Sequence, residues 1–90
     1  ALGDAEAAYG VIAAADAEAR LSVEERDRLA HGARLAETRF RAGLASFLEV
    51  LEARRAADAS GERAAAALGR AARARIILWQ ALGGGVLAAQ

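Results

Sequence analysis

Mostly small, apolar residues recur along the chain at alternating three- and four-residue steps. In the first half these positions are Ala1, Ala5, Ala8, Ile12, Ala15, Ala19, Ser22, Arg26, Leu29, Ala33, Ala36 and Phe40. In the second half they are Val50, Ala53, Ala57, Ser60, Ala64, Ala67, Ala71, Ala74, Leu78 and Ala81. This is the a/d repeat of a coiled coil, sustained for about five heptads in each half. The pattern predicts two long helices that pack along these positions, which we call the seam.

The segment between the two patterns, residues 39–52, has the sequence RFRAGLASFLEVLE and predicts a hairpin turn. Gly43 can end the first helix in the left-handed region of backbone conformation. Ser46 and Glu49 have the S-x-x-E spacing of a capping box, which predicts the start of the second helix. We therefore predict an all-α fold, a long antiparallel two-helix coiled-coil hairpin in one unit. Its expected parts are a helix over about 3–41, a turn over 42–45, a helix over about 46–82 and an irregular tail over 83–90.

Further apolar residues lie outside the seam. Phe47 and Leu48 gather around the turn beside the seam residue Phe40, and Tyr9 and Val11 lie at the far end of the first helix. A second stripe follows the far half of the second helix through Gly61, Ala65, Leu68, Ala72, Ile76 and Trp79. An isolated hairpin has no use for a second stripe, whereas a helix in the wall of a larger bundle or barrel contacts neighbours on both sides.

One local signal indicates a different fold. Ser22 and Glu25 also have S-x-x-E spacing, so a new helix starting there would give three helices and a compact bundle. The heptad phase runs through Ser22 without a skip, however, and we therefore predict a continuous first helix.

Composition agrees with long helices and excludes several functions. The chain has 28 alanines and no proline, and alanine has the highest helix propensity. Because each alanine buries little area, we expect the hairpin to need partners. Twelve arginines balance twelve acidic residues, so there is no basic field for nucleic acid. No run approaches the ~20 apolar residues of a spanning helix, and the absence of methionine and of a signal peptide suggests a piece of a longer protein.

No enzyme chemistry can be assembled from the side chains. His31 is the only histidine and lies in an arginine-rich stretch, where we expect a solvated side chain. There is no cysteine to complete a metal site with it. The glycines at 83–85 follow a helix, so they predict a helix end and not a phosphate-binding loop. We predict that the chain is not an enzyme and has no metal or cofactor.

The block RFRAGLASFLEVLE, together with LWQALGGG at residues 78–85, resembles the C-terminal periplasmic helical hairpin of the outer-membrane efflux proteins, the TolC-like family. The resemblance covers nearly all ninety residues. Two departures lie near the end: Val86 stands where the family often has an aromatic residue, and Trp79-Gln80 replaces a pair that commonly contains tyrosine.

This resemblance implies a fragment of a trimeric α-barrel duct that exports small molecules, metal ions or proteins, in multidrug efflux among other roles. The hairpin is expected in the periplasm of a Gram-negative bacterium, as part of a protein of the outer membrane. Its implied partners are two further copies of the chain, a periplasmic adaptor (membrane fusion) protein and an inner-membrane transporter. Membrane contact is expected only through parts of the parent protein outside these ninety residues.

The resemblance also assigns roles to residues near the turn. Glu49 and Glu52 are implied to form the pore constriction at the periplasmic mouth, where family members commonly have aspartate. The other interpretation is that Glu49 only completes the capping box and that Glu52 pairs with Arg55. The tip residues Ala42, Gly43 and Leu44 are implied to contact the adaptor, although Gly43 can also simply end a helix that Leu44 covers.

Two other functions fit a helical hairpin. A free-standing coiled-coil interaction module would oligomerise through its alanine seams into a four-helix bundle. An amphipathic helix at a lipid surface is the third possibility, but alanine seams and balanced charge give poor membrane affinity.

Overall fold

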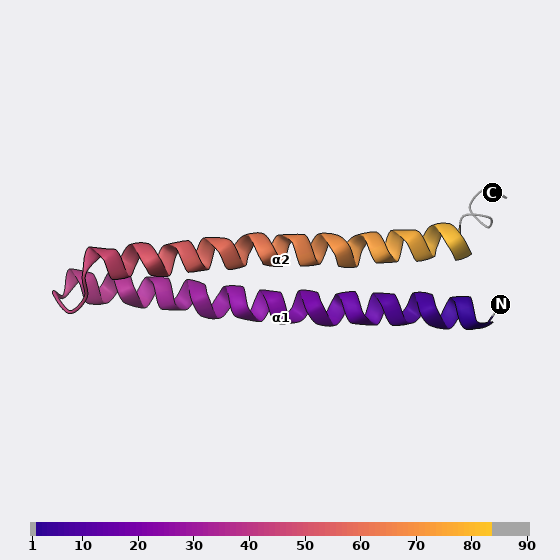
Figure 1. Ribbon diagram of the computed structural model, residues 1–90, viewed down its shortest axis with the longest axis horizontal. Helices are drawn as coiled ribbons and strands as arrows, with labels where there is room; N and C mark the ends of the chain where they lie inside the picture. Colours follow the sequence, from indigo (N-terminus) through magenta and orange to yellow (C-terminus); the bar gives the residue numbers. More distant parts are fainter. Residues whose placement is uncertain (1, 84–90) are drawn as a thin grey trace.

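The computed structural model describes residues 2–83 and contains two helices joined by a tight turn. Helix α1 spans Leu2–Arg41 and helix α2 spans Phe47–Leu82. They run antiparallel, with the turn at one end and the start of α1 and the end of α2 at the other (Figure 1). The prediction of an all-α helical hairpin is confirmed. Of the tail expected over 83–90, Gly83 ends α2 and residues 84–90 lie outside the described residues.

Helix α1 continues through the second S-x-x-E signal without a break. Ser22 and Arg26 are half-buried there, because both occupy seam positions that face α2. A break at Ser22 would gain one local cap but would take the following seam residues out of register with α2. The three-helix alternative is therefore wrong for this chain.

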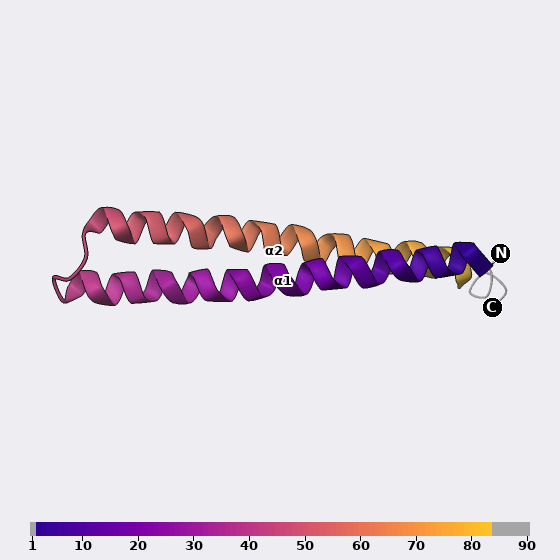
Figure 2. The ribbon, with the colours of Figure 1, turned by 60° about the horizontal axis from the view of Figure 1, so that its bottom comes forward.

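The seam is the interface between the two helices. Its buried members are Ala19, Ala33, Val50, Ser60, Ala64, Ala67 and Ala71. Ala64 is fully covered and Ala67 is 1% exposed, so the α2 backbone approaches α1 closely at this point. Turning the view shows α2 passing behind α1 toward the termini, which is the twist of a coiled coil (Figure 2). The result is a thin rod of 65 × 26 × 13 Å.

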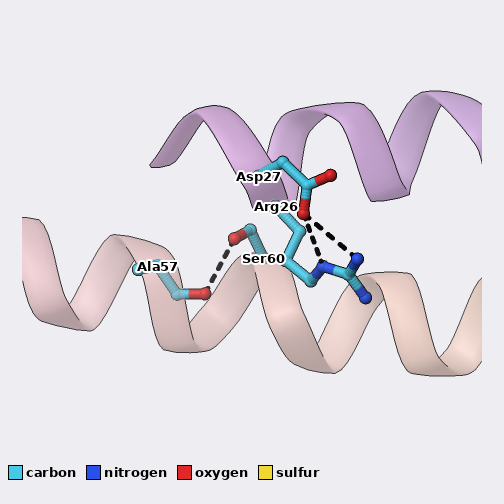
Figure 3. Close-up of polar contacts among 4 residues, drawn as sticks. All are labelled: Arg26, Asp27, Ala57 and Ser60. Atoms are coloured by element: carbon cyan, nitrogen blue, oxygen red, sulfur yellow. Dashed lines mark hydrogen bonds and ion pairs between the residues drawn. The ribbon is translucent and has the colours of Figure 1, made fainter. Parts of the chain in front are cut away.

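Two polar residues of the seam are satisfied within their own helix (Figure 3). The Ser60 hydroxyl is buried and donates to the Ala57 carbonyl oxygen at 2.7 Å. The Arg26 guanidinium donates to Asp27 from Nε at 3.2 Å and from Nη2 at 3.1 Å. Neither residue leaves an unpaired polar atom in the interface, so the alanine packing continues on both sides of them.

Among the described residues, four ion pairs connect the helices on either side of the seam, and in each an acid of α1 meets an arginine of α2. The pairs are Asp16 with Arg75, Glu18 with Arg70, Glu25 with Arg63 and Glu37 with Arg54. Each of these residues is at an e or g position, the heptad places that flank an a/d seam. The sequence contained this signal, since opposite charges occupy these positions in the two halves, but it becomes evident only when the helices are aligned.

The pair between Asp16 and Arg75 is bidentate, with two hydrogen bonds of 2.6 Å. The hydrogen bonds from Arg75 lower the pKa of the Asp16 carboxyl from its ordinary value, and the same contact raises the pKa of Arg75. This pair therefore favours the charged form of both partners.

Neither helix, as far as the structure describes it, has a stretch long and apolar enough to cross a lipid bilayer.

Candidate functional site at the hairpin tip

The end of α1 is closed by backbone hydrogen bonds around Gly43. The Leu44 amide donates to the Arg39 carbonyl at 2.8 Å, and the Gly43 amide donates to the Phe40 carbonyl at 3.0 Å. These two bonds form a Schellman motif, which requires a left-handed residue, and Gly43 has φ +77°. It is the one positive φ in the described chain. A side chain at this position would meet no other atom but would strain the backbone.

The start of α2 is capped by Ser46. This residue has an extended backbone, with φ −82° and ψ 160°, so it precedes the helix, which begins one residue later than expected. The Ser46 hydroxyl oxygen accepts a hydrogen bond from the Glu49 amide at 3.1 Å. Among the described hydrogen bonds, none joins the Glu49 carboxylate to the Ser46 amide, so the capping contact uses the backbone of Glu49 and leaves its side chain available.

Glu49 and Glu52 both lie exposed on the first turns of α2. Three residues apart, they fall on one side of the helix. Neither carboxylate takes part in an ion pair among the described residues, and the alternative pairing of Glu52 with Arg55 is absent there. The tip thus presents two adjacent, solvated negative charges.

The apolar residues of the turn are mostly exposed. The Phe40 and Phe47 rings meet with their centroids 5.7 Å apart, and yet Phe47 remains 56% exposed. Leu44, within the turn, is 68% exposed. Val50, a seam residue of α2, is 2% exposed, whereas Phe40, the last seam residue of α1, remains 43% exposed. The tip therefore offers an apolar surface next to the acid pair.

One polar contact at the tip was not expected from the sequence. The Arg39 guanidinium lies 3.4 Å from the Leu44 carbonyl oxygen, across the turn from Glu49 and Glu52. An arginine near a helix C-terminus interacts favourably with the last carbonyl groups. That signal was present in the sequence, since both Arg39 and Arg41 fall in the last turn of α1.

The described residues hold no cluster of side chains suited to a metal ion. No group of three or more His, Cys, Asp or Glu side chains comes together in this part of the chain. His31 is exposed on α1, well away from the tip in sequence and next to arginine-rich turns. Gly83 ends α2, and its amide donates to the Trp79 carbonyl at 2.6 Å, so it acts as a helix C-cap.

The second stripe on α2 is exposed. Leu68, Ile76 and Trp79 keep 47%, 54% and 68% of their surface accessible. A shallow groove runs beside it between the two helices, and its lining includes Arg20, Val23, Leu68 and Ala72. The groove ends at the ion pair between Asp16 and Arg75. This surface has no partner within the hairpin.

Comparison with known proteins gives one match. Residues 1–84 match the family model described as "Outer membrane efflux protein". No curated protein and no solved structure matches the chain significantly. The matched range covers both helices and the turn, so it includes the tip and the exposed stripe together.

Proposed function

Because this chain belongs to the outer membrane efflux protein family, we propose that its hairpin forms part of the periplasmic wall and mouth of a trimeric efflux duct. The family is one of transport components and not of enzymes. The observation that carries the proposal is the position of the acid pair: Glu49 and Glu52 are exposed and unpaired in the described structure, directly after the hairpin turn.

A role in a duct wall is supported by exposed apolar side chains on both sides of the hairpin. Leu68 of α2 is at an e position, on the same face as the ion pair of Asp16 with Arg75. Val11 of α1 is at a g position, on the opposite face. Leu21 and Leu35, at neighbouring c positions, extend the α1 surface and are 60% and 50% exposed.

Because the two apolar surfaces differ and lie on opposite faces, a contact between hairpins would be heterologous. Heterologous contacts generate rings when the rotation between copies closes. The hairpin is thus suited to a closed wall, and burial of Leu68, Ile76 and Trp79 there would offset the weak core of alanines.

At the mouth, three copies would bring six carboxylates together. Crowded like charges attract cations, and rings of acidic side chains favour the passage of cations. Opening and closing of the mouth would be passive, with energy supplied by an inner-membrane transporter through the adaptor protein. The exposed tip, where Leu44 is 68% exposed and Gly43 leaves open space beside it, is the surface proposed to meet that adaptor.

The experiment for the mouth is single-channel conductance of the assembled protein. Replacing both acids, Glu49→Gln with Glu52→Gln, should lower the preference for cations over anions and weaken block by divalent cations. Glutamine keeps the side-chain size, and the Ser46 cap uses the Glu49 amide, so the fold should persist. Asp58→Gln, on an exposed outer turn of α2, is the matched control. Conductance identical to the unmodified channel would exclude Glu49 and Glu52 from the constriction.

The interaction-module alternative is not favoured. Oligomerisation through alanine seams needs seams that face outward, whereas here the two seams bury each other within one hairpin. The surface left for partners is the second stripe, which suits lateral neighbours.

A further inference from the structure

The ion pairs between the helices follow one register. Glu18 pairs with Arg70 and Glu25 pairs with Arg63, both on the face formed by the g positions. A step of one heptad forward along α1 is thus matched by a step of one heptad backward along α2. Continuing this register by two more heptads toward the turn places Arg39 opposite Glu49.

At that level the charges are reversed: the cation belongs to α1 and the acid to α2. The described contact of Arg39 is its hydrogen bond to the Leu44 carbonyl at 3.4 Å, which is longer than the ~2.7–3.2 Å of ordinary N–H···O bonds. The Glu49 carboxylate has no ion-pair partner among the described residues. Both groups are exposed, so little holds either of them away from the other.

We propose that Arg39 is the counter-ion of Glu49 and sets how much negative charge the acid pair presents at the mouth. The expected effect of Arg39 on ion passage rests on the proposed function. The ion pair between Arg39 and Glu49 does not depend on that function. A guanidinium has five N–H donors, so Arg39 can keep the Leu44 carbonyl while it binds the carboxylate. When Arg39 pairs with Glu49, Glu52 remains as the uncompensated charge of each copy.

Arg41 is the matched control. It lies two residues beyond Arg39 in the same last turn of α1 and carries the same charge. At ~100° per residue it falls on the opposite side of the helix. An effect of Arg39 on Glu49 should therefore be absent for Arg41, whereas a general effect of positive charge near the mouth should be similar for both.

The first experiment measures the cation-to-anion permeability ratio of the assembled channel at low salt. Arg39→Gln should raise this ratio by about twofold or more, because a charge at close range is weakly screened under these conditions. Arg41→Gln should change it much less. In a Glu49→Gln background the effect of Arg39→Gln should disappear, since no charge is left for Arg39 to compensate.

The second experiment measures the pairing without ion flow. Thermal midpoints of the assembled full-length protein are compared for Arg39→Gln, Glu49→Gln and the double variant, and the same cycle is repeated with Arg41→Gln. The shifts should be non-additive for Arg39 with Glu49 and additive for Arg41 with Glu49.

The outcomes separate the two ideas. Additive shifts for Arg39 with Glu49, or equal permeability changes for Arg39→Gln and Arg41→Gln, would overturn the counter-ion assignment. Non-additive shifts, combined with a permeability ratio that Glu49→Gln leaves unchanged, would keep the ion pair and overturn the proposed constriction instead.

Discussion

Some residues of the turn satisfy the backbone hydrogen-bonding groups at the helix ends, and others have side chains that face outward. Gly43 and Ser46 satisfy the helix ends, one through its left-handed backbone and the other through its hydroxyl. Leu44, between them, contributes its amide to the first closure while its side chain stays exposed. Because the turn does not depend on the Leu44 side chain, that side chain remains exposed for contact with a partner protein.

Leu44→Asp should therefore abolish efflux while the trimer still assembles. The backbone bonds of Leu44 do not depend on its side chain, and an aspartate would place an uncompensated charge in a contact that we propose to be apolar. Efflux in cells and trimer content by native electrophoresis are the two measurements. Leu44→Met is the control, with function retained. Loss of the trimer in the Leu44→Asp variant would instead assign Leu44 a structural role.

The ion pair of Asp16 with Arg75 predicts how low pH affects the stability of the hairpin at the end away from the turn. Because the pKa of Asp16 is lowered in the folded chain, the pair contributes stability at pH values above the ordinary aspartate range. That contribution is lost as the pH falls through the lowered pKa. Asp16→Asn should remove this part of the acid dependence, as followed by helical circular dichroism of the 90-residue chain during acid titration. Asp58→Asn, outside the cross-helix pairs, should leave the acid titration unchanged, and a similar effect of both variants would contradict the assignment.

Elements are held together by a seam that is short of large side chains. Alanine at most seam positions lets the helices approach closely but buries little area for each residue. The helices must therefore gain stability over many positions, and long unbroken helices are the consequence. Alternating large and small side chains, which set the register in other coiled coils, are largely missing from the middle of the seam. The four ion pairs beside the seam set the register between the two helices instead.

Ala67→Leu should separate the helices locally. Ala67 is 1% exposed, and adding three carbons to a filled interface costs about 1–3 kcal/mol. Ala66→Leu, one residue earlier and exposed, is the control, because leucine and alanine differ little in helix propensity. Thermal unfolding of the 90-residue chain measures both. Equal midpoints for the two variants would mean that the seam is looser than the burial of Ala67 indicates.

The whole molecule is a rod with little interior. At 13 Å along its shortest axis, the hairpin is hardly thicker than one helix with its side chains, which is ~10–12 Å. Every residue outside the seam therefore faces either solvent or a partner. Exposed Leu68, Ile76 and Trp79 favour a partner along the far half of α2.

Trp79 reports this contact directly, because it is the only tryptophan of the chain. Its side chain is 68% exposed in the isolated hairpin. In a duct assembled with Trp79 as the only tryptophan of the full-length protein, its fluorescence maximum should lie at a shorter wavelength than in the 90-residue chain, since burial against a neighbour removes water from the indole. Acrylamide quenching should decrease in parallel. Equal emission and quenching in both forms would show that this stripe remains solvated after assembly.

The sequence by itself determined the hairpin, because the signals that define it are local. Missing proline and abundant alanine favour uninterrupted helix, and Gly43 and Ser46 end and start the helices through contacts within a few residues. The seam was also readable, since a heptad repeat is a property of one helix at a time. The resemblance to the efflux family depended on the block around the same turn.

Only the tertiary structure decided which charges meet. The pairing of Asp16 with Arg75 or of Glu25 with Arg63 depends on the register between two helices, and an alanine seam carries too little size variation to reveal that register from sequence. For the S-x-x-E signal at Ser22, the structure confirmed the prediction from the heptad phase that no new helix starts there, because continued burial of the seam outweighs one local cap. The proposed pairing of Arg39 with Glu49 likewise depends on extending the register of these ion pairs, a relation between residues on different helices that no local pattern contains.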